Sequence, residues 1–181
     1  MSRADTALGA HRRLLDKWRK AMDLIGPGPA EPHFQDAIGA VEGLTVEGRW
    51  ADLGSGAGFP GIALAALHAD AEVLLVESRQ KRAIFLKKVV AEARLDNARV
   101  VHGRTEALED GTFDGIISRA YKPPRKFLAD AERLLGPGGV AVMMLGDRTD
   151  HDLPPGWERV RTDRYAVADG FRVRTVARRT E

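Results

Sequence analysis

The residues best suited to chemistry form a glycine-rich stretch that begins with an acid. Asp52-Leu53-Gly54-Ser55-Gly56-Ala57-Gly58 follows a short apolar run and precedes an apolar segment that starts at Phe59. Glycine permits tight turns and lets the backbone approach a ligand closely. Glu77 ends the next apolar run, where a carboxylate can accept hydrogen bonds from both ribose hydroxyls of a nucleoside. Together these residues predict a nucleoside-binding site.

The glycine spacing separates two classes of nucleoside cofactor. The NAD fingerprint G-x-G-x-x-G needs its third glycine three positions after the second, whereas the glycines here occupy positions 54, 56 and 58. Asp52 also suits a cationic amino-acid group better than a pyrophosphate. We therefore expect the cofactor to be S-adenosylmethionine.

The elements that must position these residues alternate between strands and helices from residue 49 onward. Two amphipathic helices come first, over Thr6–Ile25 and Glu31–Val41. Apolar runs then predict strands over Trp50–Leu53, Glu72–Val76, Arg99–His102, Phe113–Ile117 and Val140–Leu145. Helices are predicted over Phe59–Leu67, after a capping Ser78, and over Phe127–Leu135. Trp157–Ala166 and Phe171–Ala177 alternate around Asp169-Gly170, which is typical of a β-hairpin.

This alternation predicts an α/β fold. Strand–helix repeats require parallel pairing with right-handed crossovers. We expect a Rossmann-like domain of the class I S-adenosylmethionine-dependent methyltransferase type, with a mostly parallel seven-stranded sheet and an antiparallel C-terminal hairpin strand. Residues 1–45 would form a helical extension and residues 46–181 the core of one domain.

Composition limits the remaining possibilities. A length of 181 residues suits one domain. The sequence has no cysteine, which excludes thiolate metal sites and suits a reducing cytoplasm. No His/Asp/Glu cluster has metal-ligand spacing, and the longest apolar stretches have only the length of strands. We expect a cytoplasmic monomer that uses no metal and contacts no membrane.

Basic residues cluster although the formal net charge is only +2. Eight lie between Arg79 and Arg104, against Glu92 and Asp96 as the acids of that segment. Arg119, Lys122, Arg125 and Lys126 add four more. Such clusters contact phosphates in nucleic-acid-binding proteins, but they also occur on solvated helix faces.

Several blocks of this sequence resemble a known family. They are Gly54-Ser55-Gly56-Ala57-Gly58-Phe59-Pro60-Gly61, Glu77-Ser78 with Lys81-Arg82 and Phe85-Leu86, Leu95-Asp96-Asn97, Gly103-Arg104-Thr105-Glu106, and Phe113-Asp114-Gly115-Ile116-Ile117-Ser118-Arg119-Ala120. They are similar to the bacterial 16S ribosomal RNA guanine-N7 methyltransferases, also called glucose-inhibited division protein B. The resemblance covers roughly residues 14 to 146 and implies methylation of a guanine N7, with ribosomal RNA or the small ribosomal subunit as partner.

The resemblance also implies roles for individual residues. Arg119 would face the cofactor and the target base as a catalytic residue, and Asp23, in the place of a family asparagine, is a second catalytic candidate. Thr105 and Glu106 would flank the adenine. The full set expected at the cofactor is Asp52, Gly54, Ser55, Gly56, Gly58, Phe59, Glu77, Ser78, Arg104, Thr105, Glu106 and Arg119.

The sequence departs from the family pattern at three places. Asp23-Leu24-Ile25 replaces Asn-Leu-Thr, only His33 and Asp36 remain of Arg-His-x-x-Asp-Ser, and Leu145-Gly146 replaces Lys-Gly. Two alternatives therefore stay open. One is a diverged methyltransferase that acts on another RNA or on a small molecule. The other is a non-catalytic S-adenosylmethionine-binding module, against which the intact Glu77 and glycines argue.

Overall fold

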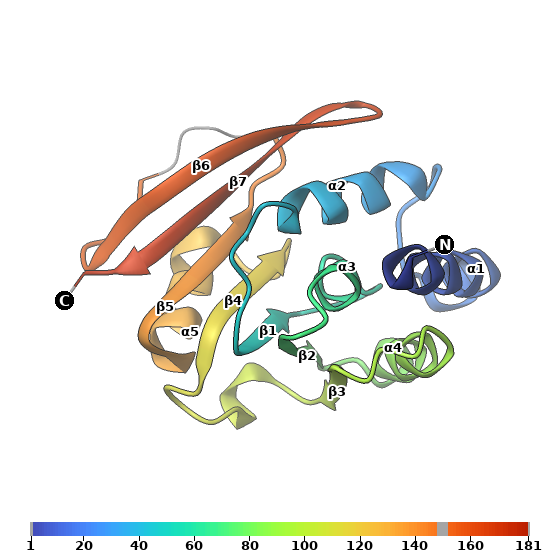
Figure 1. Ribbon diagram of the computed structural model, residues 1–181, viewed down its shortest axis with the longest axis horizontal. Helices are drawn as coiled ribbons and strands as arrows, with labels where there is room; N and C mark the ends of the chain where they lie inside the picture. Colours follow the sequence, from blue (N-terminus) through green and yellow to red (C-terminus); the bar gives the residue numbers. More distant parts are fainter. Residues whose placement is uncertain (1, 148–151, 181) are drawn as a thin grey trace.

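The computed structural model describes residues 2–147 and 152–180, and its centre is a seven-stranded sheet (Figure 1). The strand order is β3-β2-β1-β4-β5-β7-β6. The strands are β1 (Arg49–Leu53), β2 (Glu72–Glu77), β3 (Ala98–His102), β4 (Phe113–Arg119), β5 (Leu135–Met144), β6 (Trp157–Val167) and β7 (Gly170–Arg179).

The pairing within the sheet confirms the predicted fold class. β1 to β5 pair in parallel, and β7 lies antiparallel to both β5 and β6. The order reverses between β1 and β4, which creates the crevice where ligands bind in open α/β sheets. Because the carboxyl ends of parallel strands share one edge, Leu53, Glu77 and Arg119 end their strands at this crevice.

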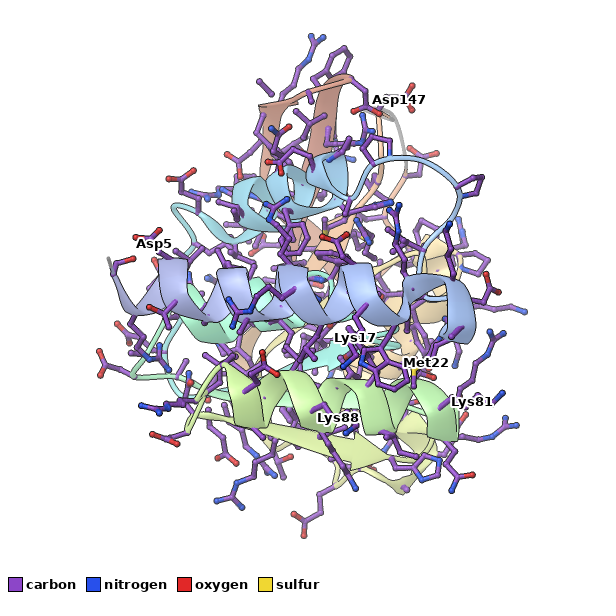
Figure 2. The ribbon with its side chains drawn as sticks, turned by 90° about the vertical axis from the view of Figure 1, so that its right-hand side faces the viewer. Asp5, Lys17, Met22, Lys81, Lys88 and Asp147 are labelled. Carbon is purple, nitrogen blue, oxygen red and sulfur yellow. The ribbon has the colours of Figure 1, made fainter. Side chains whose placement is uncertain are left out.

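Helices cover the two faces of the sheet unequally. α1 (Arg3–Met22), α2 (Glu31–Val41), α3 (Gly61–Leu67) and α4 (Gln80–Glu92) share one core with the buried strand residues Trp50, Leu75 and Ile117. α5 (Pro124–Leu134) packs on the other face, over β4 and β5. Figure 2 shows α1 and α4 lying side by side on the outer surface of the first face. Among the described residues, no helix is both long and apolar enough to cross a membrane.

Two predicted element boundaries are wrong for local reasons. α1 begins at Arg3, where Ser2 and Asp5 form a reciprocal capping box, and it ends at Met22 because Asp23 adopts a left-handed conformation with φ 50°. Ser78 does not cap α4. The residue at the cap position is Arg79, and its N–H donates instead to Glu77 Oε1 at 2.7 Å.

The third difference concerns the glycine-rich segment after α5. The sequence predicts that Gly136-Pro137-Gly138-Gly139 ends a helix and precedes a strand, but β5 already begins at Leu135. A register shift between Phe113 and Gly115 on β4 accommodates this start. The residues that position the site are unaffected, because the opposite, carboxyl end of β5 reaches it.

Candidate active site

The glycine-rich loop is held in shape by its own backbone and by β2. The N–H groups of Gly54 and Ser55 both donate to the Val76 carbonyl, at 2.9 and 3.0 Å, and Ser55 Oγ donates to the Asp52 carbonyl at 2.9 Å. Gly54, Gly56 and Gly58 have φ values of 70°, 55° and 95°, which L-residues with side chains rarely adopt. The predicted need for glycine at these three positions therefore has a conformational cause.

Glu77 ties this loop to the beginning of α4. Its Oε2 accepts the Gly56 N–H at 2.9 Å and its Oε1 accepts the Arg79 N–H at 2.7 Å. The side chain is 5% exposed, so the two bonds fix the carboxylate at the carboxyl end of β2. Each oxygen keeps a further lone pair, which can accept a hydroxyl of a ligand.

A cavity of about 390 Å³ opens beside Glu77. We call it the nucleoside cavity. Its lining includes six residues that the sequence assigns to the cofactor: Gly54, Glu77, Ser78, Arg104, Thr105 and Glu106. The structure therefore brings the ends of β1, β2 and β3 together around one concave site.

Asp52 lies beneath the loop and is fully buried. Its Oδ2 accepts the Gly61 N–H at 3.0 Å, at the first residue of α3, whereas Oδ1 has no hydrogen-bond partner within the described protein. Burial raises the pKa of this carboxyl to about 7, although the Gly61 N–H and the positive charge of Arg119 act in the opposite direction. An unpaired buried oxygen on an acid that titrates near neutrality is suited to a cationic ligand group.

Arg119 ends β4 and reaches across to α2. Its Nη1 lies 3.2 Å from Asp36 Oδ2 and 3.3 Å from His33 Nδ1, and its guanidinium carbon lies 4.8 Å from the centre of the Phe59 ring. Burial lowers the pKa of His33, and the charge of Arg119 lowers it further, so the neutral ring can accept the Arg119 N–H. The face of the Phe59 ring contacts the guanidinium as a cation–π partner.

Two further cavities meet at Arg119. One, of about 560 Å³, lies between the ends of β4 and β5, and its lining includes Phe127, Met144 and Leu145; we call it the β4–β5 cavity. The other, of about 500 Å³, includes His33 and Arg172 in its lining. Arg119 and Asp36 line both cavities. Arg119 therefore lies where the two cavities meet.

His11 supports the loop from α1. The side chain is fully buried, and its Nε2 lies 2.7 Å from the Ala57 carbonyl; because a carbonyl only accepts, Nε2 must carry the proton. Burial lowers the pKa of His11 to about 4, so the ring is neutral near physiological pH. Its ring centre lies 5.0 Å from that of Phe34 and 4.9 Å from that of Phe59. This aromatic cluster joins α1, α2 and the loop.

Asp23 lies apart from these groups. It is exposed at the end of α1, its carbonyl accepts a hydrogen bond from Arg82 Nη2 at 2.8 Å, and it lines a separate cavity of about 360 Å³ with Arg19 and Lys20. It shares neither the nucleoside cavity nor the β4–β5 cavity. Its catalytic role stays a prediction without support from this geometry.

Sequence reasoning missed Tyr121. Its hydroxyl lies 2.9 Å from Thr105 Oγ1, and its ring is so close to Gly54 that a Cβ there would lie 2.7 Å from Tyr121 Cδ2. Tyr121 lines both the nucleoside cavity and the β4–β5 cavity, so it lies between them. Its place two residues after Arg119, at the end of a strand, is the signal that would have identified it.

The basic run from Arg79 to Arg104 is not a single surface. Arg79, Arg82 and Arg104 line the nucleoside cavity. Arg94 follows α4 and Arg99 lies near the start of β3, at the opposite edge of the sheet. Figure 2 shows Lys81 and Lys88 on the exposed side of α4, with Lys17 of α1 nearby. Spacing along the chain therefore overstated how many of these charges lie near the site.

The residues present fit S-adenosylmethionine. Glu77 offers a fixed carboxylate for ribose, Asp52 has an unpaired buried oxygen for an ammonium group, and Gly54 lets the Tyr121 ring pack against the loop on the wall of the nucleoside cavity. When bound, this cofactor supplies a methyl group on a sulfonium, which is already activated for transfer. Glu77 and the glycine loop would hold its nucleoside part, and Asp52 its amino-acid part.

Comparison with solved structures supports the fold. A putative O-methyltransferase from Klebsiella pneumoniae superposes with a TM-score of 0.68 at 19% identity, covering 95% of this chain and 90% of that one. The O-methyltransferase from Bacillus cereus, solved in complex with SAH, gives a TM-score of 0.64 at 17% identity, covering 95% and 91%. Both likenesses concern the fold.

Sequence comparison is more specific. Residues 5–169 match the family described as GidB, rRNA small subunit methyltransferase G. The protein named ribosomal RNA small subunit methyltransferase G from Paracoccus denitrificans is 36% identical over 151 residues, which are 81% of this chain and 78% of that protein. Its namesake from Halorhodospira halophila is 34% identical over 144 residues, 77% and 68% of the two chains. This chain thus belongs to the rRNA small subunit methyltransferase G family of S-adenosylmethionine-dependent methyltransferases.

Proposed function

We propose that this protein transfers the methyl group of S-adenosylmethionine to N7 of a guanine in small-subunit ribosomal RNA. Family membership supports the acceptor class. The observation that carries the proposal is the position of Arg119, held at the junction of two cavities next to the cofactor loop. Because the proposed substrate is ribosomal, we also propose that the enzyme works in the cytoplasm. We further propose that it acts as a monomer and uses no metal.

The chemistry of guanine N7 explains why so few groups are needed. N7 carries a lone pair in the plane of the ring and no proton, so no general base is required. Orientation then supplies most of the catalysis, an effect worth up to about 7–11 kcal/mol. Among the described residues, the hydrogen bonds of the Arg119 side chain run through Nη1, so its Nε and Nη2 donors can bind O6 beside N7.

One observation favours a second candidate acceptor. The β4–β5 cavity has an apolar wall that includes Phe127, Met144 and Leu145, where the family pattern has a lysine in place of Leu145. Such a wall could take a small apolar molecule instead of a nucleotide that is anchored by its phosphate. The acceptor experiment below distinguishes the two.

Small ribosomal subunits that lack this modification are expected to accept labelled methyl from S-adenosylmethionine, and nuclease digestion should recover the label as N7-methylguanosine. Subunits that already carry the methyl group serve as the matched control and should remain unlabelled. If the cofactor binds but unmodified subunits take up no label, the ribosomal assignment is wrong and the acceptor is of another class.

Reversing the charges of Arg125 and Lys126 beside the site should weaken the binding of RNA. Arg125 and Lys126 are exposed in the first turn of α5, whereas Lys122 is paired with Asp130 at 2.7 Å and lines the nucleoside cavity. The double change Arg125→Glu and Lys126→Glu is expected to raise KM for the subunit about tenfold and to lower the salt slope of binding by about 1 to 2. Acids in the first turn also suit the helix dipole, so the fold should tolerate the change.

The matched control carries the same charge change at the far edge of the sheet. Arg94→Glu with Arg99→Glu reverses two exposed charges after α4 and at the start of β3. This variant should keep the KM and salt slope of the unaltered enzyme. Equal losses in both double variants would show that only the total charge of the protein matters.

A further inference from the structure

Arg119 forms an ion pair with Asp36, whose carboxylate is itself held in place by a second hydrogen bond. The Arg119 side chain is 21% exposed and that of Asp36 only 11%. Asp36 Oδ2 accepts from Arg119, and Asp36 Oδ1 accepts from the hydroxyl of Tyr165 at 2.8 Å. Each carboxylate oxygen therefore has one partner, and the three side chains form a continuous chain from β6 to β4.

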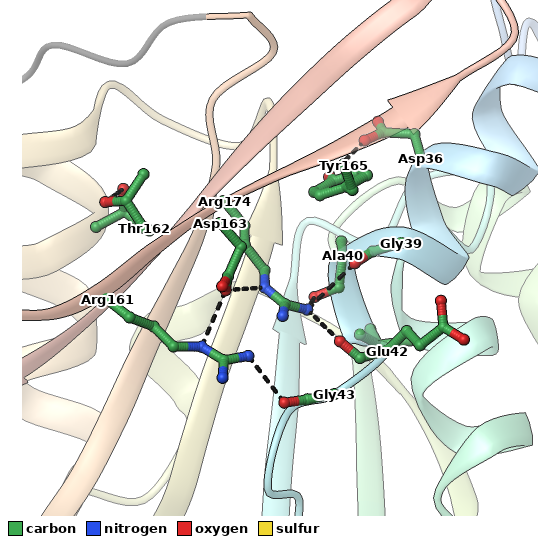
Figure 3. A network of polar contacts seen from close by, with 12 residues as sticks. Asp36, Gly39, Ala40, Glu42, Gly43, Arg161, Thr162, Asp163, Tyr165 and Arg174 are labelled. Carbon is green, nitrogen blue, oxygen red and sulfur yellow. Dashed lines mark hydrogen bonds and ion pairs between the residues drawn. The ribbon is translucent and has the colours of Figure 1, made fainter.

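Tyr165 reaches this position because its ring packs into a slot on the surface of α2, at Gly39. A Cβ added at Gly39 would lie 2.3 Å from Tyr165 Cδ2, so only glycine at position 39 lets the ring lie against the helix. Burial and the negative charge of Asp36 both raise the pKa of Tyr165, so the hydroxyl stays protonated and donates. Figure 3 shows the ring of Tyr165 beside α2, with its hydroxyl directed at Asp36.

The hairpin that carries Tyr165 is itself fastened to α2. Arg174 of β7 is 4% exposed, and its Nη1 donates to the carbonyls of Gly39, Ala40 and Glu42 at 3.2, 2.7 and 2.7 Å, which satisfies the end of the helix. Asp163 Oδ2 holds Arg174 Nε at 2.7 Å and Arg161 Nε at 2.9 Å (Figure 3). The edge of the sheet farthest from the cofactor loop is thus joined to the residues around Arg119.

We propose that Asp36 and Tyr165 are positioning residues, which hold the guanidinium of Arg119 in place for the acceptor base. The hydroxyl of Tyr165 fixes the Asp36 carboxylate, and the carboxylate fixes Nη1. The remaining N–H donors of Arg119, on Nε and Nη2, are then already held in a fixed orientation when the acceptor base binds. This inference rests on the proposed function, because the role of Arg119 toward a base is part of that function.

The test removes one oxygen atom from Tyr165. Tyr165→Phe keeps the ring in the Gly39 slot and deletes only the bond to Asp36. We expect kcat for methylation of the small subunit to fall about tenfold, as for loss of one hydrogen bond to a charged group, with the Kd for S-adenosylmethionine unchanged within about twofold. Thr162→Val is the matched control, because it deletes a hydroxyl on the same strand that pairs with Thr175 Oγ1 at 3.1 Å. It should leave kcat unchanged.

A double-mutant cycle separates positioning from a general structural role. If Tyr165 acts through Arg119, Tyr165→Phe should have almost no further effect on kcat in an Arg119→Ala background. A tenfold loss in both backgrounds would overturn the proposal. So would an unchanged kcat in the single variant.

A second readout does not depend on methyl transfer. The Nε–Hε group of Arg119 can be observed by nuclear magnetic resonance, and Tyr165→Phe should increase its motion on the picosecond-to-nanosecond timescale while Thr162→Val does not. If the unaltered enzyme fails to methylate ribosomal subunits but Arg119 still loosens in Tyr165→Phe, the proposed function is wrong and the positioning network stands. If Arg119 does not loosen, the network is wrong.

Discussion

Replacing Glu77 by glutamine is expected to weaken the binding of S-adenosylmethionine about 100-fold. Both carboxylate oxygens of Glu77 already accept main-chain N–H groups, from Gly56 and from Arg79. A glutamine amide has one oxygen and one NH₂ group, so one of these N–H groups would face a donor. The amide also loses the charge that strengthens the bonds to two ribose hydroxyls, each worth about 1.5 kcal/mol or more.

Isothermal titration calorimetry with two ligands makes this test specific. 5′-Methylthioadenosine carries the ribose but has no amino-acid group, so Glu77→Gln should weaken both ligands by a similar factor. Glu72→Gln is the matched control, because Glu72 begins the same strand that Glu77 ends. Thermal unfolding of both variants checks that the loop still folds. Undiminished binding of both ligands to Glu77→Gln would show that Glu77 only shapes the loop.

The sequence was sufficient for the fold because the sheet follows simple periodicity. Strands buried on both faces, such as β1 and β2, appear as short apolar runs between glycine-rich turns. Parallel pairing then places their carboxyl ends together, so Glu77 and Arg119 could be assigned to one edge without coordinates. The shape of the loop could also be predicted from its glycines, because positive φ values leave little other choice of residue.

What could not be predicted depends on contacts between segments far apart in the chain. Nothing in the local sequence shows that Tyr165 meets Asp36, 129 positions earlier, or that Arg174 satisfies the end of α2. Such contacts follow from how the hairpin docks on the helices. Ser78 does not cap α4, because Arg79 occupies the cap position and its N–H donates to the side chain of Glu77.

Charge patterns gave the least reliable expectations. For the basic run from Arg79 to Arg104 the sequence left a phosphate-binding surface and a solvated helix face as alternatives. Its members lie at both ends of α4 and of β3 and do not form one surface. Lys122, which was expected among the phosphate-binding groups, is paired within the protein, because its Nζ donates to Asp130 Oδ2 at 2.7 Å. The spacing of charges along the sequence does not determine the distances between them in the fold. The positions of strand ends, by contrast, follow from the topology of the sheet.

The affinity for S-adenosylmethionine should depend on pH through Asp52. The pKa of this carboxyl is about 7 because the group is buried, so below pH 7 it is mostly neutral in the cofactor-free protein. An ammonium group binds the ionised form, so affinity should rise up to about tenfold per pH unit from pH 5 to 7 and then level off. It should fall again above about pH 8, where an α-amino group loses its proton.

The raised pKa of Asp52 also has a consequence for folding. Between about pH 4 and 7 the folded protein keeps a proton on Asp52 that the unfolded chain has released, so this group lowers the free energy of unfolding as the pH rises through that range. Asp52→Asn removes the ionisable group without changing its size. The variant should therefore lose both this slope of stability and the acid limb of cofactor binding.

The two ligands again separate a role at the cofactor from a role in the fold. 5′-Methylthioadenosine has no ammonium group, so its affinity should be nearly independent of pH and insensitive to Asp52→Asn. Glu77→Gln, by contrast, should weaken both ligands at every pH. If S-adenosylmethionine binds Asp52→Asn as tightly as the unaltered protein at pH 7.5, Asp52 serves only to accept the Gly61 N–H at the start of α3. The ammonium group must then be bound elsewhere, because a buried carboxylate next to it could not be removed without loss.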